Sequence, residues 1–468
     1  MRRVVAIVVI CAGTLAFILA LRGRLYPFCA HNEHVRFASN TNRTFKGERP
    51  PVPDFYDPVD YVAWCNSFLA AGKSDESIRI YDGFWRYHGD EECMPDPSKP
   101  VAKQLRKLSA GPTWRKGQYP EVENYMEDVA EYVERFKKAT RSKEYALQLM
   151  HDPETPNVGS LPWTVSGEYA VCVLLAKSWQ AKVNQFEDIY NAWQVGLKHV
   201  NHLQRSRTLI PITRSSFVQL IILRSARNAV DTGVIDIDDS RKVLDLLGRS
   251  TPESFSLTEG IYSEWAAALG LIQELYAGGH LNKRYAELFA GLDVDTLRRS
   301  NVKPPVLVIA LDKYFSKLLH ISDQPMSIKL LEDIRTLQDQ SFEDPLSNHP
   351  LRSLIFPRME RPVLLQLEAL ASLRATVTIL LLHDYHLRHD AWPNSLSELK
   401  FTEHADYLID PFSGDEFIYR TTGESFLLYT VSGDKNDNGG KHAAWGRWTE
   451  IEDASDFVFW PIQQQQDF

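Results

Sequence analysis

The C-terminal part of this chain changes its hydrophobic period, and that change constrains the fold more than any other feature. Residues 363–388 repeat apolar side chains at helical spacing. Residues 416–420 and 425–429 instead alternate or run apolar, and the loop at 421–424 separates them, which predicts a β-hairpin. A turn at 410–414 precedes the hairpin, opened by an aspartate and closed by a glycine. A long helix packed on a short antiparallel sheet is an α+β unit.

The helix at 363–388 is apolar enough to suggest a membrane span. Gln366, Glu368 and Arg374 interrupt its apolar run. We therefore expect a half-buried helix of a soluble domain at this position.

Upstream, residues 61–340 read as one helical domain. Amphipathic segments such as 238–247 and 259–276 follow one another, with proline or glycine at the breaks. One apolar stripe recurs at three and four residues and predicts a single long helix with its aromatic side chains in a core. Its members are Leu175, Trp179, Val183, Phe186, Tyr190, Trp193, Leu197 and Val200. The chain is thus expected to be mainly α. Because no fixed-period repeat is present, an irregular helical bundle and an α-solenoid-like body both remain open.

The N-terminus predicts a membrane anchor. Residues 4–21 are 18 uncharged, mostly apolar residues, at the short end of what spans a hydrocarbon core of roughly 30 Å. A cleaved signal peptide is the alternative, but Ile18 and Phe28 occupy places where cleavage needs small residues. Arg2 and Arg3 favour a cytoplasmic tail. We expect a single-pass protein of the inner (cytoplasmic) membrane, with its bulk in the periplasm or otherwise outside the cytoplasm.

Composition and charge exclude one class of partner. The net charge is −9 with both signs interspersed, and no long Lys/Arg block exists, which argues against a nucleic-acid surface.

Residues 22–60 are polar and carry prolines, as a tether would, and residues 462–468 read as a disordered tail. In an exported domain Cys65 and Cys93 could form a disulfide, and buried free thiols are the alternative.

A loop rich in Asp, Asn and Gly follows the hairpin. Residues 434–440 read Asp-Lys-Asn-Asp-Asn-Gly-Gly, with oxygen side chains at alternate positions before glycine. A tightly curved loop of this kind turns several oxygens inward, and Ca²⁺ requires roughly six to eight of them. The spacing matches the first half of an EF-hand loop, but Trp445 stands where that loop has its final glutamate. Asp453 and Asp456 could supply the missing carboxylates, and a solvated turn is the alternative.

The order of these C-terminal features resembles the major pseudopilin of type II secretion systems. The shared features are Trp392-Pro393, Leu396, Leu399, Asp410-Pro411-Phe412, Phe417, Tyr419, Leu428-Tyr429-Thr430, the loop at 434–440, Asp453 and Asp456. The resemblance covers residues 361–461 and implies a pilin-like α+β domain whose loop binds calcium. The calcium ligands that it implies are Asp434, Asn436, Asp437 or Asn438, together with Asp453 and Asp456.

A second resemblance concerns the whole chain. It is similar to large planctomycete-type membrane-anchored proteins, through the PPVPD segment and the helices that follow it. In a pseudopilin the apolar N-terminal helix carries a prepilin-peptidase signal and leads into the sheet domain. Here residues 4–21 lack that signal and lie at the other end of the chain. A component related to type II secretion is therefore an alternative function, not the first one.

No catalytic set is legible in the sequence. Gly-rich phosphate loops, G-x-S-x-G and H-E-x-x-H do not occur. His383, His386 and His389 follow one another at three-residue spacing, so the first two could share a metal, and a solvated helix end is the alternative. We expect a non-enzymatic protein whose helical body binds or scaffolds a protein partner. A hydrolase whose site is assembled from distant residues is the second alternative.

Overall fold

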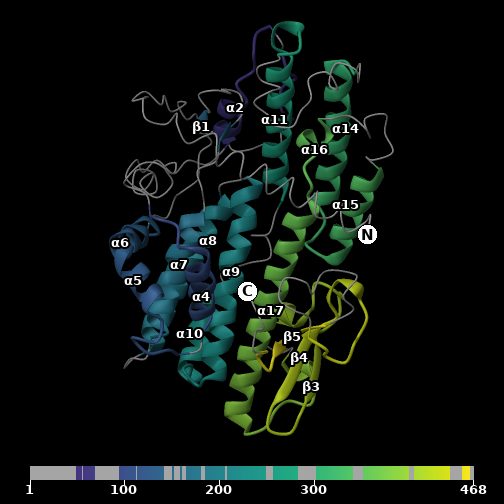
Figure 1. Cartoon of the computed structure of the whole chain (residues 1–468). Coiled ribbons are helices and arrows are strands. Elements are labelled where there is room, and N and C mark those ends of the chain that lie inside the picture. The colour runs from purple at the N-terminus through teal and green to yellow at the C-terminus, as the bar shows by residue number, and fades with distance from the viewer. Residues whose placement is uncertain are drawn as a thin grey trace, which may run out of the picture.

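The computed structural model describes most of the chain between residues 49 and 463. The described ranges are 49–54, 56–68, 94–111, 113–141, 150–151, 159–160, 165–180, 185–205, 208–248, 257–282, 302–340, 351–399, 405–442 and 456–463. The predicted anchor at 4–21, Cys93 and Asp453 lie outside these residues. The described part is mainly helical, with a small three-stranded antiparallel sheet near the C-terminus (Figure 1). The predicted mainly α class with a C-terminal sheet is confirmed at this level.

The elements follow one another along the chain with few interruptions by strand. The helices are α2 (Tyr61–Phe68), α4 (Lys99–Ser109), α5 (Pro120–Asp128), α6 (Ala130–Ala139), α7 (Val165–Ser178), α8 (Gln185–Arg205), α9 (Leu209–Asp231), α10 (Ile237–Gly248), α11 (Thr258–Leu275), α14 (Pro304–Ser322), α15 (Ile328–Gln340), α16 (Arg352–Ile355) and α17 (Glu360–His389). The strands are β1 (Met150–His151), β2 (Gly159–Ser160), β3 (Ile418–Thr421), β4 (Phe426–Thr430) and β5 (Phe457–Trp460).

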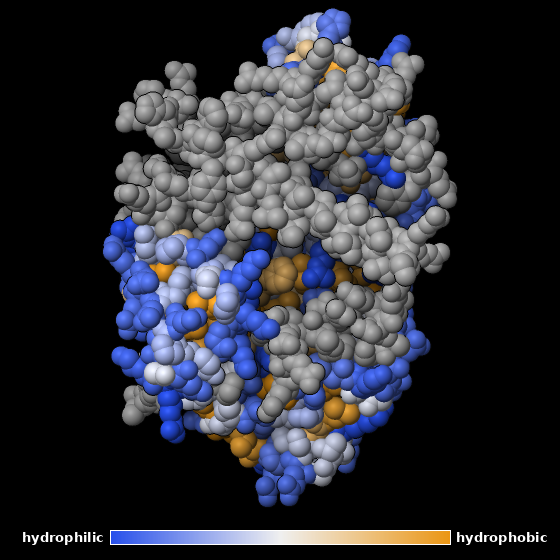
Figure 2. Space-filling view, viewed as in Figure 1, coloured by the Kyte–Doolittle hydropathy of each residue, from blue (hydrophilic) through white to orange (hydrophobic). Residues whose placement is uncertain are grey.

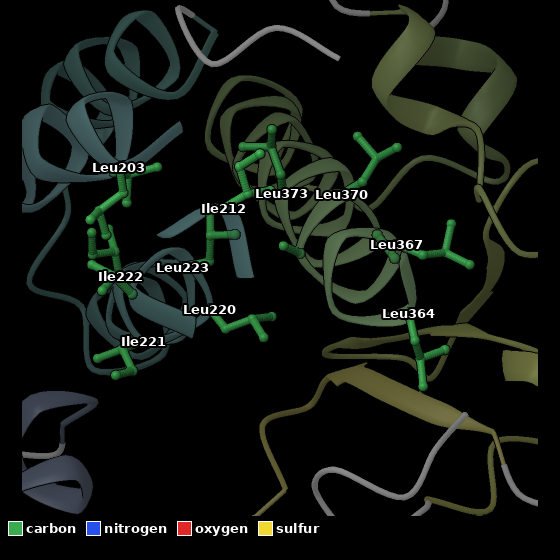
Figure 3. Close-up of a cluster of buried hydrophobic side chains, with 14 of the residues drawn as sticks. Leu203, Ile212, Leu220, Ile221, Ile222, Leu223, Leu364, Leu367, Leu370 and Leu373 are labelled. Atoms are coloured by element: carbon green, nitrogen blue, oxygen red, sulfur yellow. The ribbon is translucent and has the colours of Figure 1, made fainter. Parts of the chain in front are cut away.

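The centre of the molecule is the contact between α9 and α17. In Figure 3, Leu220 and Leu373 lie between the two helices, whereas Leu367 points away from α9 on the far side of α17. The buried Arg227 of α9 adds a polar link, because its guanidinium donates to Ser372 Oγ and Thr376 Oγ1 of α17, both at 2.8 Å. Apolar burial therefore holds the helices together, and the guanidinium fixes how they are aligned.

α17 is buried on all sides along most of its length. By length and composition it could cross a membrane, yet 94% of its most apolar 18-residue window is buried inside the protein. α9, α10 and α15 pack on it, and β4 and β5 contact it from the sheet. The prediction of a half-buried helix is wrong in degree. Helices cover one face of α17 and the sheet covers the opposite face. An apolar pattern on all sides of a helix is therefore typical of a core helix.

The predicted long helix through Trp179 and Trp193 is in fact two helices. α7 ends at Ser178 and α8 begins at Gln185, with residues 181–184 outside the described ranges. Both tryptophans are buried, and their indole N–H groups donate to one acceptor, Ser225 Oγ of α9, at 2.9 and 3.0 Å. The core role of the stripe is confirmed. The prediction of one long helix is wrong because the apolar spacing continues from α7 into α8.

The sheet has the order β3-β4-β5 and is antiparallel throughout. Thr421 pairs with Phe426, so the hairpin loop is 422–425, one residue later than predicted. Asp410 opens the preceding turn as expected: its Oδ1 accepts from the Phe412 N–H at 2.9 Å, and Gly414 has φ 80°. The hairpin and turn are confirmed because both depend on local side-chain chemistry.

Hydrophilic groups predominate on the coloured part of the surface, and the buried apolar side chains form the core. The face drawn in Figure 2 is mostly hydrophilic over α5, α6 and α10, with hydrophobic groups scattered between.

Cys65 of α2 is a buried free thiol, so its pairing with Cys93 is not part of this structure. Burial raises the Cys65 pKa far above its usual range, which makes this thiol unreactive.

Candidate metal loop and helical groove

The loop at 434–440 leaves β4 through a tight bend. Ser432 and Lys435 adopt positive φ values of 58° and 60°, which turn the chain sharply around the short helix η5 (Ser432–Asp434). The Lys435 ammonium forms an ion pair of 2.7 Å with Glu332 of α15. The predicted metal loop is therefore attached to the helical body as well as to the sheet.

Asp437 faces the hairpin. Its carboxylate accepts hydrogen bonds from the Tyr429 hydroxyl at 2.7 Å and the Gly439 N–H at 2.8 Å, and it pairs with Arg420 at 2.9 Å. These donors lower the pKa of Asp437, the Tyr429 hydroxyl most of all. A carboxylate with three donors, one of them cationic, is already compensated and is a poor candidate for a metal ligand.

Asp456 holds the other side of the loop. It is fully buried just before β5 and accepts the backbone N–H groups of Asn438 at 3.3 Å and Gly440 at 2.6 Å. Burial raises the Asp456 pKa, and the negative charges of Asp437 and Asp434 raise it further, while the two N–H donors oppose the shift. The carboxylate therefore joins the loop to the C-terminal strand.

The remaining predicted ligands cluster around Asp434. Its Oδ1 accepts from the Asn436 N–H at 3.1 Å, and its Oδ2 from the Asn438 side-chain amide at 3.4 Å. Neither Asp434 nor Asp456 forms an ion pair with any residue in the described ranges. Asn438 contacts both of them, through its side chain and its backbone. Asp453 lies outside the described residues.

The described residues fit a hard cation only in part. Asp434 and Asp456 both accept hydrogen bonds from Asn438, and the charges of the two aspartates repel each other. Within the described ranges, no group of three or more His, Cys, Asp or Glu side chains is arranged to hold a metal. Calcium binding remains a prediction that depends on these three residues and on Asp453.

The histidines at the end of α17 pack among aromatic rings. His386 stacks on Trp392 with ring centroids 4.1 Å apart, and His383 lies 5.2 Å from both Trp392 and Trp460. His389 instead lies 4.3 Å from Tyr385. Burial, with a contribution from His386, lowers the His383 pKa to about 4. The histidines thus contact aromatic rings and, within the described ranges, do not form a shared ligand set.

A groove of about 590 Å³ lies between α6, α7 and α8. α7 packs against both other helices and supplies the groove with Val173, Leu174 and Lys177. Further lining residues are Met126, Ala130, Val133, Glu134, Lys137, Thr140, Arg141, Ser178, Asp188, Asn191, Ala192, Gln194, Val195 and Lys198. The groove is thus apolar in its depth and polar at its edges, as protein-binding surfaces are.

Three cations at the groove have no anionic partner among the described residues. Glu134 pairs with Lys137 at 2.9 Å, but Arg141, Lys177 and Lys198 form no ion pair within the described ranges. Reasoning from the sequence missed this surface, because the three cations come from separate segments of the chain. Only the packing of the helices brings them to one place.

Comparisons with known proteins add no relative. No family model matches this chain, and no curated protein or solved structure matches it either. The likeness to pseudopilins therefore depends on the residues between 361 and 461 alone.

Proposed function

We propose that this protein is a non-enzymatic scaffold of the cell envelope. In this proposal residues 4–21 anchor it in the inner membrane, residues 22–60 form a tether, and the helical body binds a protein partner outside the cytoplasm. The observation that carries the proposal is the groove between α6, α7 and α8. An open groove with an apolar floor and charged edges suits a protein segment.

The C-terminal unit forms the rigid end of the proposed scaffold. Its pilin-like character is supported by a three-stranded sheet that contacts a long helix, α17. We include calcium as a ligand of its loop, held by Asp434, Asn438 and Asp456 with Asp453. A bound divalent cation would supply the positive charge that offsets repulsion among these carboxylates.

A component related to type II secretion is the second candidate. The same contact between α17 and the sheet favours it. However, α9 and α10 cover other faces of α17, so this helix has little free surface for packing against other subunits. The groove on the helical body therefore favours the scaffold.

Site-specific photo-crosslinking tests the scaffold proposal in the full-length protein within its native membrane. A photoreactive amino acid at position 177 lies in the groove, and the matched control at position 313 lies on the exposed side of α14. We expect one crosslinked protein partner from position 177 and none from position 313. Equal products from both positions, or no product from position 177, would contradict partner binding in this groove.

A further inference from the structure

We infer that the groove between α6, α7 and α8 binds an amphipathic helix whose apolar face is flanked by acidic side chains. This inference rests on the proposed scaffold function and names the chemistry of the partner. It follows from the shape of the groove, from its apolar floor and from the sign of the charges at its edges.

The shape of the groove suits a short helix. The wall on the side of α6 extends from Ala130 to Ala139, which at the rise of an α-helix is roughly 14 Å, or about two and a half turns, and Arg141 follows just beyond its end. On the opposite wall, α8 presents Asn191, Val195 and Lys198, one and two turns apart. An occupant of three turns would therefore meet side chains along its whole length.

The floor of the groove is apolar. Val173 and Leu174 of α7 lie at its base, with Val133 of α6 and Ala192 and Val195 of α8 beside them. Leu174 and Val195 are only half-buried, so each retains apolar surface that a partner can cover. An amphipathic helix that inserts residues at i, i+3, i+4 and i+7 buries such a surface.

The charges at the edges select acidic flanks. Arg141 follows α6, Lys177 is on α7 and Lys198 is on α8, and none of the three has an ion-pair partner among the described residues, in a chain whose net charge is −9. Of the two carboxylates that line the groove, Glu134 pairs with Lys137, and Asp188 also has an interaction partner. A helix with Glu or Asp beside its apolar face would pair with these three cations, whereas a basic helix would be repelled.

Two designed peptides test this inference against the full-length protein in detergent. Both are helices of about four turns with leucine at i, i+3, i+4 and i+7, and one carries glutamate flanks where the other carries lysine flanks. Fluorescence anisotropy measures their binding. We expect the glutamate peptide to bind at least about tenfold more tightly than the lysine peptide.

A charge-reversed protein provides the second arm. Lys177→Glu with Lys198→Glu should weaken binding of the glutamate peptide about tenfold and strengthen binding of the lysine peptide. The matched control is Lys303→Glu with Lys313→Glu, which changes the net charge equally on the exposed surface at α14 and should leave both affinities unchanged. All four lysines are exposed, so these variants should fold normally.

The possible outcomes separate this inference from the proposed function. Equal binding of both peptides, or no effect of the groove reversal, would overturn the acidic partner while leaving a helix-binding scaffold. A crosslinked partner from position 177 without binding of either peptide would also overturn the acidic partner and leave the scaffold. The absence of both peptide binding and crosslinks would overturn the inference and the scaffold together.

Discussion

The Gly440 N–H donates a hydrogen bond of 2.6 Å to the Asp456 carboxylate, and this bond closes the loop against β5. Gly440 has φ 83°, a conformation that side chains other than glycine rarely adopt. A Cβ atom at this position would also lie 3.0 Å from Leu427 Cδ2. The positive φ therefore favours glycine here, and the Leu427 side chain would have to move by a few tenths of an ångström to admit a Cβ atom.

Gly440→Ala should lower the free energy of unfolding by about 2 kcal/mol, because it adds backbone strain and displaces Leu427. Urea denaturation of the full-length protein measures this. Gly423→Ala is the control, since Gly423 has φ 82° but a Cβ atom there would meet no heavy atom within 4 Å. It should cost only the strain, about 1 kcal/mol. Equal losses in the two variants would show that the contact with Leu427 is unimportant.

Calcium should raise the thermal midpoint of the full-length protein relative to a chelator. A ligand that binds only the folded state at a hundredfold excess over its Kd adds about 2.7 kcal/mol to the free energy of unfolding. Asp434→Ala with Asp456→Ala should abolish the response, whereas Asp415→Ala, an exposed aspartate of the same unit, should keep it. An unchanged midpoint in the wild-type protein would leave the loop as a solvated turn.

His383 should make the fold sensitive to acid. Its folded-state pKa of about 4 lies below the ordinary value of 6.5, so its stabilising effect is complete above pH 6.5 and is lost as the pH falls toward 4. The loss should reach roughly 3 kcal/mol. His383→Phe keeps a ring against Trp392 and Trp460 and should flatten this part of the pH dependence. His389→Phe, at an exposed position, should leave the wild-type slope, and an unchanged slope in His383→Phe would refute the assignment.

Asp410 should act in the opposite direction. Burial raises its pKa from 3.8 to about 6, so the folded state binds the proton more tightly and stability falls as the pH rises between these values. Asp410→Asn can keep the bonds to the Phe412 N–H and to Thr430 without a buried charge. We expect the free energy of unfolding of this variant at neutral pH to exceed that of the wild type by up to roughly 3 kcal/mol. Urea denaturation measures this difference. Asp415→Asn is the exposed control and should have little effect. A less stable Asp410→Asn would mean that the carboxylate charge is needed.

Features that depend on neighbouring residues could be predicted from the sequence. The segments 238–247 and 259–276 match α10 and α11 to within one residue at each end, and the hairpin and the Asp410 turn are present. Each of these is encoded within a few residues, by an apolar period or by a side chain that bonds its own backbone.

The tertiary structure alone decided which faces meet. Periodicity could not reveal that α9 and the sheet cover opposite sides of α17, or that the stripe through Trp179 and Trp193 divides into two helices. Nor could it bring Arg141, Lys177 and Lys198 to one groove, or direct Asp437 to the hairpin and Asp456 to Gly440. A local pattern specifies that a face must be buried or a charge compensated, but the partner lies far along the chain, and only packing selects it.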